Sequence, residues 1–201
     1  MANELYPIFL KTHRFPILII GGGNVAHEKL SFLLKSSPNS NVELIAKEFS
    51  SKVLGIAQAY GIKTITKAYE KTDLINKQLI IAATNDIEIN QNIYRDSKSL
   101  NILVNVADTP NLCDFYLGGI VTKGDVKIAI STNGKSPSMA KRLRQYFEKN
   151  LPNDLNQLVN NLNKVRHAIS SDLEKRSKTI NSLTQEFLND KTKIDYKEVK
   201  L

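Results

Sequence analysis

The sequence is poor in the residue types that mark several classes of protein. Its 201 residues include one cysteine, three histidines and no tryptophan. Because a single cysteine, Cys113, cannot form an internal disulfide, the chain is not a small disulfide-stabilised secreted protein. His13, His27 and His167 fit neither the spacing of a zinc site nor that of a catalytic triad, so we expect no permanent metal site.

Long apolar runs are also missing. No stretch approaches the roughly 20 consecutive apolar residues of a membrane span, and the N-terminus lacks the basic and then apolar pattern of a signal peptide. Hydrophobic residues nevertheless make up 41% of the chain, which is enough for one core and a smaller second unit. We therefore expect a globular cytoplasmic protein with no membrane partner.

The formal charge of +8 is unevenly distributed. Residues 1–113 carry 12 Lys+Arg against 10 Asp+Glu, whereas residues 114–201 carry 16 against 10. No helix-turn-helix, zinc-ligand or RNA-binding aromatic pattern accompanies this excess, so we expect no nucleic-acid partner. Two interpretations stay open, a polyanionic small-molecule ligand and a solvated basic surface without a ligand.

An apolar run at residues 17–20 ends in three glycines and is followed by a helical pattern. The run is β-branched and does not alternate, which is typical of a strand buried on both faces of a parallel sheet. Residues 21–26 (Gly-Gly-Gly-Asn-Val-Ala) fit the G-x-G-x-x-A pattern of a dinucleotide-binding turn, although a purely structural turn has the same pattern. The residues expected to bind the cofactor here are Gly21, Gly22, Gly23, Asn24 and Val25.

Strand and helix patterns alternate through the first half of the chain. Strands are predicted at residues 17–20, 41–46, 62–66, 78–83 and 102–105, with helices after the glycines and at about 50–60 and 86–99. This alternation predicts a Rossmann-type α/β domain, a doubly wound parallel sheet, over residues 1–113.

The pattern changes beyond residue 113. Residues 115–122 and 125–131 predict a hairpin, and Ser136-Pro137 predicts the start of a helix that runs to about residue 149. Residues 151–201 form a helical segment with predicted helices at about 153–171 and 176–190. Because a hairpin with one helix is too small to be stable alone, we expect a homodimer formed through the small α+β unit at 114–150.

Polar residues follow three of the predicted strands, at the edge where open α/β sheets bind ligands. Thr84 and Asn85 follow the fourth strand, and Asp108 follows the fifth. Asp108 either accepts a proton from a substrate or merely caps the turn before Pro110, and the residues alone leave both open. After the second strand Lys47 precedes Glu48, so this position does not separate NAD, whose ribose an acid would bind, from NADP, whose phosphate a lysine would accept.

Five segments taken together resemble the siroheme-synthase dehydrogenase family. They are residues 5–10 (Leu-Tyr-Pro-Ile-Phe-Leu), 21–26, 82–85 (Ala-Ala-Thr-Asn), 105–108 (Asn-Val-Ala-Asp) and 131–137 (Ser-Thr-Asn-Gly-Lys-Ser-Pro). The similarity extends in order over about residues 1–150. Members of this family are precorrin-2 dehydrogenases, and some of them also insert iron.

The resemblance implies an NAD-dependent oxidation of precorrin-2 to sirohydrochlorin, a step toward siroheme. It places the family's essential aspartate at Asp108, as general base or as a helper in metal chelation. The carboxylates of the tetrapyrrole would then be bound by polar and basic residues of the second unit: Lys135, Ser136, Lys141, Arg142 and Arg144.

Two alternatives accompany this interpretation. The first is a bifunctional dehydrogenase and sirohydrochlorin ferrochelatase, and the second is a non-catalytic NAD-sensing dimeric module. Thr132 stands where some relatives have a phosphorylated serine, which makes that regulation doubtful. Because the sequence ends at Leu201, we expect no methyltransferase domain and a separate enzyme that supplies precorrin-2.

Overall fold

The structure is a computed structural model that describes residues 3–168 and 173–185. Its chain forms two compact units, Met1–Gly119 with Ala129–Lys141, and Ile120–Ile128 with Arg142–Leu201. Parts of the two predicted C-terminal helices, at residues 169–171 and 186–190, lie outside the described residues.

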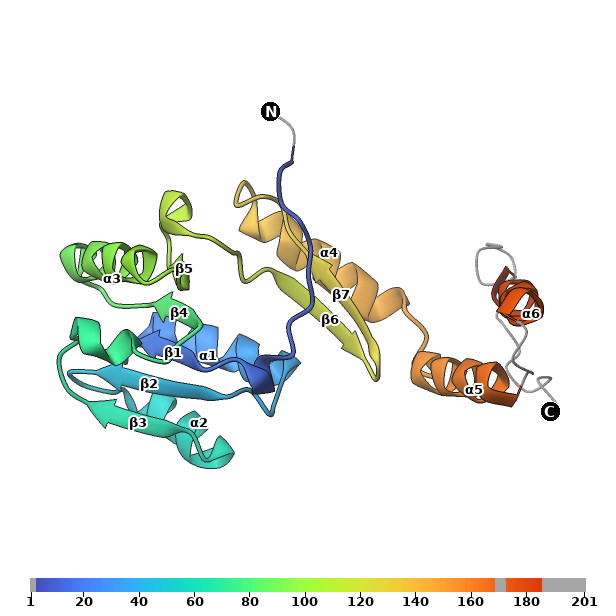
Figure 1. Cartoon of the computed structure of the whole chain (residues 1–201), viewed down its shortest axis with the longest axis horizontal. Helices are drawn as coiled ribbons and strands as arrows, with labels where there is room; N and C mark the ends of the chain where they lie inside the picture. Colours follow the sequence, from blue (N-terminus) through green and yellow to red (C-terminus); the bar gives the residue numbers. More distant parts are fainter. Residues whose placement is uncertain (1–2, 169–172, 186–201) are drawn as a thin grey trace. The chain divides into compact units, whose positions relative to one another are not determined.

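A five-stranded parallel sheet forms the centre of the first unit (Figure 1). Its strand order is β3-β2-β1-β4-β5, so the order reverses between β1 and β4. The register pairs Ile17 with both Val42 and Leu79. The strands are β1 (Ile17–Ile20), β2 (Val42–Ala46), β3 (Lys63–Thr66), β4 (Leu79–Ala82) and β5 (Leu103–Val106).

Three helices connect these strands: α1 (Asn24–Ser36), α2 (Ser51–Tyr60) and α3 (Ile87–Ser99). Ser50 caps α2 by accepting a hydrogen bond from the Val53 amide, and Asp86 caps α3 in the same way. Gly61 ends α2 with a φ of 64°, a conformation that costs glycine nothing. Short 3-10 turns, which the sequence patterns did not predict, are η1 (Thr12–Arg14), η2 (Lys71–Leu74) and η3 (Pro110–Leu112).

The core has one layer on each face of the sheet. Ile17 and Ile19 of β1 pack with α1 and α2, whereas Leu18 and Ile20 pack with α3 and η2. All four side chains are at most 3% exposed. Burial of each such side chain stabilises the fold by about 1.5–3 kcal/mol, which explains why the strands are continuously apolar. The predicted doubly wound Rossmann-type fold is confirmed.

A hairpin and three further helices make up the rest of the described chain. The hairpin pairs β6 (Gly119–Lys123) with β7 (Val126–Ile130), and the helices are α4 (Pro137–Asn150), α5 (Leu155–Ala168) and α6 (Leu173–Gln185). Within the second unit, Asn156 Oδ1 accepts a hydrogen bond of 2.9 Å from the Asp125 amide in the hairpin turn. No helix in the described ranges is both long enough and apolar enough to cross a membrane.

Candidate active site

The carboxyl ends of the five strands are joined by a row of backbone hydrogen bonds. Each bond runs from the residue that follows one strand to the end of its neighbour: Lys67 N to Ala46 O (2.9 Å), Gly21 N to Ile45 O (2.9 Å), Ala83 N to Ile20 O (2.8 Å) and Ala107 N to Ala82 O (2.9 Å). The loops that follow the strands therefore leave from one fixed edge. Strands in a sheet lie about 4.8 Å apart, so the loops after β1 and β5, which β4 separates, begin about 10 Å apart.

The three glycines after β1 have different tasks. Gly21 has a φ of 134°, and a Cβ there would overlap the carbonyl of Ala83; a Cβ on Gly22 would overlap the carbonyl of Glu48. These two glycines allow the loops after β4 and β2 to pack against the turn. A Cβ on Gly23 would meet nothing within 4 Å, so Gly23 leaves open space beside the turn, where a ligand can approach the backbone.

Helix α1 begins at this open space without a side-chain cap. Gly23 occupies the N-cap position, and the first turn contains no acidic residue. The first intrahelical bond of the turn is donated by His27 to the Gly23 carbonyl, at 3.0 Å, so the amides of Asn24, Val25 and Ala26 have no acceptor one turn earlier in the helix. Amides at a helix N-terminus bind phosphate groups, and this turn therefore fits a pyrophosphate.

The loop after β2 is held directly against the glycine turn. The Ser50 amide donates a 2.9 Å hydrogen bond to the Gly22 carbonyl, and the side chains of Lys47 and Glu48 are both exposed. An acidic residue in this loop binds the adenosine ribose in many Rossmann domains. Lys47 and Glu48 are thus the residues of this chain at that loop position.

Thr84 and Asn85 follow β4 at the same edge, but only one of the two side chains is free to contact a ligand. The Thr84 hydroxyl donates to Asn90 Oδ1 at 2.7 Å and accepts from the Asp86 amide at 3.2 Å, and Asn90 Nδ2 returns a bond to the Thr84 carbonyl. Thr84 therefore positions the start of α3. The Asn85 side chain is exposed and remains available to a ligand.

Asp108 lies in the loop after β5, in a strained turn. Thr109 donates a hydrogen bond of 3.2 Å to the Val106 carbonyl, and Asp108 has a φ of 58°. Residues other than glycine seldom adopt this left-handed conformation, although aspartate tolerates it. The turn presents the exposed Asp108 carboxylate at the carboxyl edge, two strands from the glycine turn.

Two side chains close the loop that carries Asp108. Asn105 is 6% exposed and donates a 2.7 Å hydrogen bond to the Phe115 carbonyl. Asp114 Oδ2 accepts a hydrogen bond from the Val104 amide at 3.0 Å, and its other oxygen contacts Lys98 Nζ at 2.7 Å. The loop leaves β5 and returns to it within ten residues, so the position of Asp108 is fixed from both ends.

Cys113 contributes to the same loop as a neutral thiol. Its Sγ donates to the carbonyls of Val106 (3.2 Å) and Thr109 (3.3 Å). Burial raises the pKa of the Cys113 thiol. The hydrogen bond with Val106 lowers this pKa by a smaller amount, so the net shift is upward. Because the thiolate is the nucleophilic form, Cys113 is suited to packing rather than to nucleophilic catalysis.

The segment before α4 forms a second ordered loop next to this one. Asn133 and Gly134, with φ of 54° and 73°, occupy the centre of a turn closed by a 3.1 Å bond from the Lys135 amide to Thr132. A Cβ on Gly134 would lie 4.0 Å from Cγ of Pro110, in the loop of Asp108. The exposed Lys135 is therefore brought to the region of Asp108.

The remaining basic candidates lie at or beyond the start of α4. Ser136 caps the helix by accepting a hydrogen bond from the Met139 amide at 3.2 Å, as the sequence predicts. Lys141 is exposed in the first unit. Arg142 and Arg144 belong to the second unit, where Arg142 contacts Gln145 and Arg144 pairs with Glu148 at 2.5 Å.

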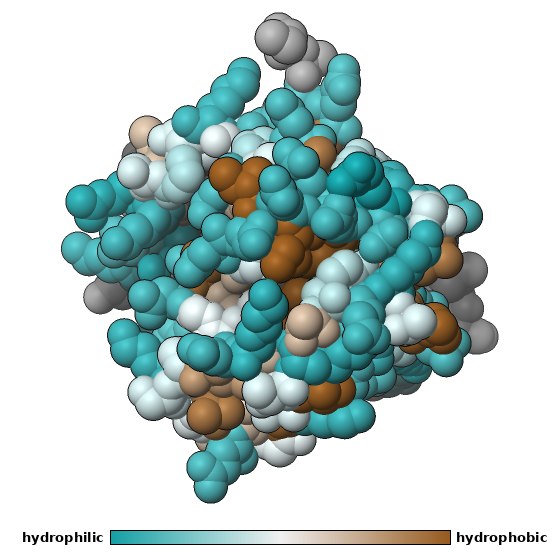
Figure 2. Space-filling view, turned by 90° about the vertical axis from the view of Figure 1, so that its left-hand side faces the viewer, coloured by the Kyte–Doolittle hydropathy of each residue, from teal (hydrophilic) through white to brown (hydrophobic). Residues whose placement is uncertain are grey.

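A depression of about 550 Å³ opens beside Lys47. The carboxyl edge of the sheet faces the viewer in Figure 2, where apolar surface at the centre is ringed by hydrophilic side chains. The depression is lined by residues that follow β2 and β3 and by one side of α3: Lys47, Ala68, Tyr69, Glu70, Lys71, Ile89, Asn92, Arg95 and Asp96.

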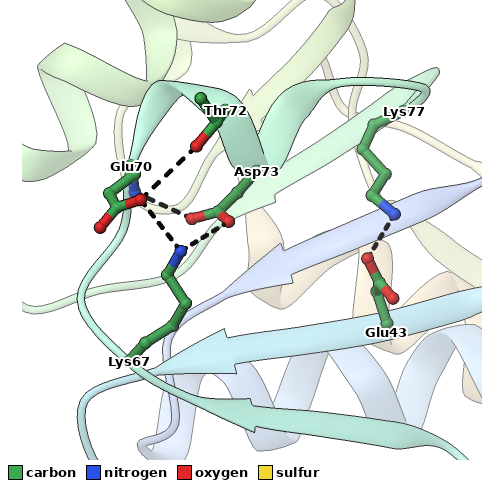
Figure 3. Close-up of polar contacts among 6 residues, drawn as sticks. All are labelled: Glu43, Lys67, Glu70, Thr72, Asp73 and Lys77. Atoms are coloured by element: carbon green, nitrogen blue, oxygen red, sulfur yellow. Dashed lines mark hydrogen bonds and ion pairs between the residues drawn. The ribbon is translucent and has the colours of Figure 1, made fainter.

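Ion pairs hold the η2 segment that forms one wall of this depression. Lys67 Nζ lies 3.0 Å from Asp73 and 3.2 Å from Glu70, and the Glu70 amide donates to Asp73 at 2.9 Å (Figure 3). The bond with Asp73 raises the pKa of the Lys67 ammonium group. A separate pair, Lys77 with Glu43, ties the start of β4 to β2.

Sequence reasoning did not find two parts of this site. Tyr69, Lys71 and Arg95 belong to segments far from the glycine motif in sequence, and only packing of α3 against η2 brings them beside Lys47. The second part is Asn105, which the sequence could have indicated because it is a polar residue in an otherwise apolar strand pattern. In the described part of the chain, no cluster of three His, Cys, Asp or Glu residues is arranged to hold a metal ion.

The fold and the glycine turn define a Rossmann-type dinucleotide-binding protein. A family model described as putative NAD(P)-binding matches residues 8–119, and one described as sirohaem biosynthesis protein, central, matches residues 123–150. The chain belongs to the NAD(P)-binding family of siroheme synthases. These matches support NAD, the cofactor that the resemblance implies.

Several curated relatives support this assignment. Proteins named siroheme synthase are 36% identical over 154 residues in Psychrobacter arcticus and 38% identical over 156 residues in Methylococcus capsulatus. These alignments cover 77% and 78% of this chain but only 28% and 32% of the relatives. The chain thus corresponds to about a third of the length of these relatives or less.

A solved structure has the same fold over nearly the whole chain. The structure titled "SirC, precorrin-2 dehydrogenase" superposes with a TM-score of 0.74 and covers 91% of each chain at 20% sequence identity. This likeness extends beyond the Rossmann domain to the elements that follow it.

Proposed function

We propose that this chain catalyses the NAD-dependent dehydrogenation of precorrin-2 to sirohydrochlorin in siroheme biosynthesis. The family assignment and the name of the structurally similar protein support this reaction. The observation that carries the proposal is the position of Asp108, which stands in a strained, closed loop on the same sheet edge as the dinucleotide turn.

The strand order supports a proposed place for each half of the cofactor along this edge. The adenosine half lies toward β2, whose following loop packs on Gly22, so the nicotinamide half lies toward β4 and β5. Bound NAD supplies the hydride acceptor. The loops that follow β4 and β5 then present Asn85 and Asp108 to the reacting part of the substrate.

Asp108 has the role of general base in this scheme. Dehydrogenation removes a hydride and a proton from the tetrapyrrole, and the Asp108 carboxylate takes the proton. A positioned base contributes about 10²–10⁴-fold to a rate. Because hydrogen bonds fix the backbone around Asp108, its carboxylate is already positioned at the sheet edge before the substrate binds.

Basic residues around α4 are proposed to bind the acidic arms of the substrate. Lys135 lies near the Asp108 loop, and the helix that begins after Ser136 offers a further anion site. Lys141, Arg142 and Arg144 extend this basic character along α4. Charge-assisted bonds from such groups are suited to a polycarboxylated ligand.

We also propose that the chain consists of a Rossmann domain at residues 1–113, a small unit at 114–150 and a helical segment at 151–201. Two copies of the chain associate in the cytoplasm through the unit at 114–150. Met139, Leu143 and Tyr146 are spaced along α4 and are 54%, 36% and 61% exposed. Such exposed apolar side chains on one helix commonly mark an interface.

A spectroscopic assay tests the proposed reaction. Purified chain is incubated with precorrin-2 and NAD, and sirohydrochlorin is followed by its absorbance before ferrous or cobalt ion is added. Formation of sirohydrochlorin without metal supports the dehydrogenase, and failure to form it while NADH still binds leaves the NAD-sensing alternative. Metal insertion faster than in a protein-free control identifies the bifunctional alternative.

A further inference from the structure

The depression beside Lys47 carries more positive than negative charge close to the adenosine half of the dinucleotide site. Three cationic side chains line it, Lys47, Lys71 and Arg95, against the two carboxylates of Glu70 and Asp96. The β2 loop that carries Lys47 is bonded to the glycine turn through Ser50 and Gly22. The depression and the glycine turn therefore lie along the same carboxyl edge of the sheet.

Both carboxylates in the depression are already engaged by other groups. Glu70 accepts from Lys67 Nζ at 3.2 Å. Asp96 accepts from the Tyr69 hydroxyl at 2.9 Å and pairs with Lys71 Nζ at 3.5 Å. With Lys67 and its partner Asp73 included, four cations face three carboxylates, so the lining keeps a small excess of positive charge.

Lys47 and Arg95 are the cations that remain available. The Arg95 guanidinium contacts only the neutral amide of Asn92 among the described residues. Within the same residues the Lys47 side chain makes no hydrogen bond or ion pair. Both side chains are exposed to the depression. Tyr69 and Ile89 add aromatic and apolar surface to the same depression, which suits the base of a nucleotide.

We propose that this depression is an anion subsite for the 2′-phosphate of NADP, so that the chain binds NADP(H) as well as NAD(H). Lys47 occupies the loop position that in NAD-specific domains carries an acid for the ribose 2′-hydroxyl, and a cation there accepts a phosphate. Arg95, on α3, lines the same depression and supplies a planar donor set for phosphate oxygens. The proposal rests on the dinucleotide site of the proposed function and assigns its specificity.

Direct binding measurements test this specificity without turnover. The chain contains no tryptophan, so the fluorescence of bound NADH and NADPH is read without interference from that residue. We expect the two affinities to agree within about tenfold at low salt, with the NADPH affinity falling more steeply as salt is added. Adenosine 2′,5′-diphosphate then displaces NADPH better than ADP does, and inorganic phosphate alone competes weakly.

Variants assign the effect to the two cations. Lys47→Gln and Arg95→Gln each lower the ratio of NADPH to NADH affinity by about tenfold to a hundredfold, the range for one charge-assisted bond. Lys52→Gln is the matched control, because Lys52 is an exposed lysine of α2 that does not line the depression. Its ratio stays at the wild-type value.

The outcomes separate this proposal from the proposed function. If NADH binds and NADPH binds more than a hundredfold more weakly to the unaltered chain, the phosphate subsite is wrong and the dehydrogenase proposal stands. Equal loss of both affinities in the variants also overturns the subsite. If neither dinucleotide binds, both proposals fail. The comparison of adenosine 2′,5′-diphosphate with ADP needs no variant and so does not depend on whether a variant folds.

Discussion

Asn105 Nδ2 donates a hydrogen bond of 2.7 Å to the carbonyl of Phe115, and so connects the end of β5 to the far side of the loop that carries Asp108. The amide is 6% exposed and also contacts Cys113 Sγ at 3.4 Å. A buried polar side chain in a sheet stabilises the fold only when its hydrogen bonds are made. Here those bonds hold a backbone turn beside the candidate active site.

Replacing Asn105 with alanine leaves the Phe115 carbonyl without its donor. We expect Asn105→Ala to lower the free energy of unfolding by about 1–3 kcal/mol, measured by urea denaturation. Asn111→Ala is the control in the same loop, since Asn111 is exposed, and it should change this free energy by less than about 0.5 kcal/mol. Equal effects of the two changes would show that the Asn105 bond is not the cause.

Asp108→Asn removes the proposed base while keeping the shape of the turn. Asparagine also tolerates a positive φ, so thermal unfolding should stay near that of the wild type. We expect kcat for sirohydrochlorin formation to fall about 10²–10⁴-fold. Asp125→Asn, in the exposed hairpin turn, serves as the control, and turnover by Asp108→Asn at the wild-type rate would exclude the assigned role.

The glycine turn predicts opposite results for two alanine substitutions. Gly21→Ala forces a side chain into the Ala83 carbonyl at a φ of 134°, and we expect it to cost more than about 3 kcal/mol of folding free energy. Gly23→Ala meets nothing within 4 Å, so the fold should persist while NADH binding weakens at least about tenfold. Urea denaturation and NADH fluorescence titration measure the two effects.

Stability should fall in alkaline solution partly because of Tyr69. Burial, and then the hydrogen bond to Asp96, raise the pKa of the Tyr69 phenol above its ordinary value of 10.0. A raised pKa in the folded state gives a stabilising contribution that is complete below pH 10 and is lost as the pH rises above it. Spectrophotometric titration should show one phenol that ionises after the rest.

Tyr69→Phe identifies that phenol and its effect. The variant should lose the late step of the titration and show a shallower decline of unfolding free energy above pH 10 than Tyr60→Phe, whose phenol is 50% exposed. If both variants decline alike, Tyr69 does not contribute to the alkaline loss.

The homodimer is tested at α4. Tyr146→Lys replaces the most exposed of the three apolar side chains with a charge, and we expect it to shift the sedimentation coefficient from that of a dimer to that of a monomer. Lys149→Glu, a charge change at an exposed position of the same helix, is the control. A wild-type chain that sediments only as a monomer at micromolar concentration would rule out the dimer.

Local patterns were sufficient to predict most of the first unit. The apolar run at Ile17–Ile20 and the helices at about 50–60 and 86–99 each depend on residues near them in sequence, and each was found where expected. Asp108 could be placed at the sheet edge because a βαβ pattern fixes where strands end. The left-handed backbone conformation of Asp108 could not be predicted, because it depends on the hydrogen bonds that close the loop.

The parts that escaped prediction depend on contacts between distant segments. Tyr69 meets Asp96 across 27 positions, and Asn105 meets Phe115 on the return of a loop, so no periodicity marks either pair.

The close packing of Gly22 against the Glu48 carbonyl has a consequence for substitutions at position 47. The backbone of the β2 loop is held by this contact and by the bond from Ser50 to Gly22, whereas the side chain of Lys47 is exposed. A point mutation at position 47 therefore alters charge without displacing the chain. We therefore expect substitutions at position 47 to alter the charge beside the glycine turn with little loss of folding stability.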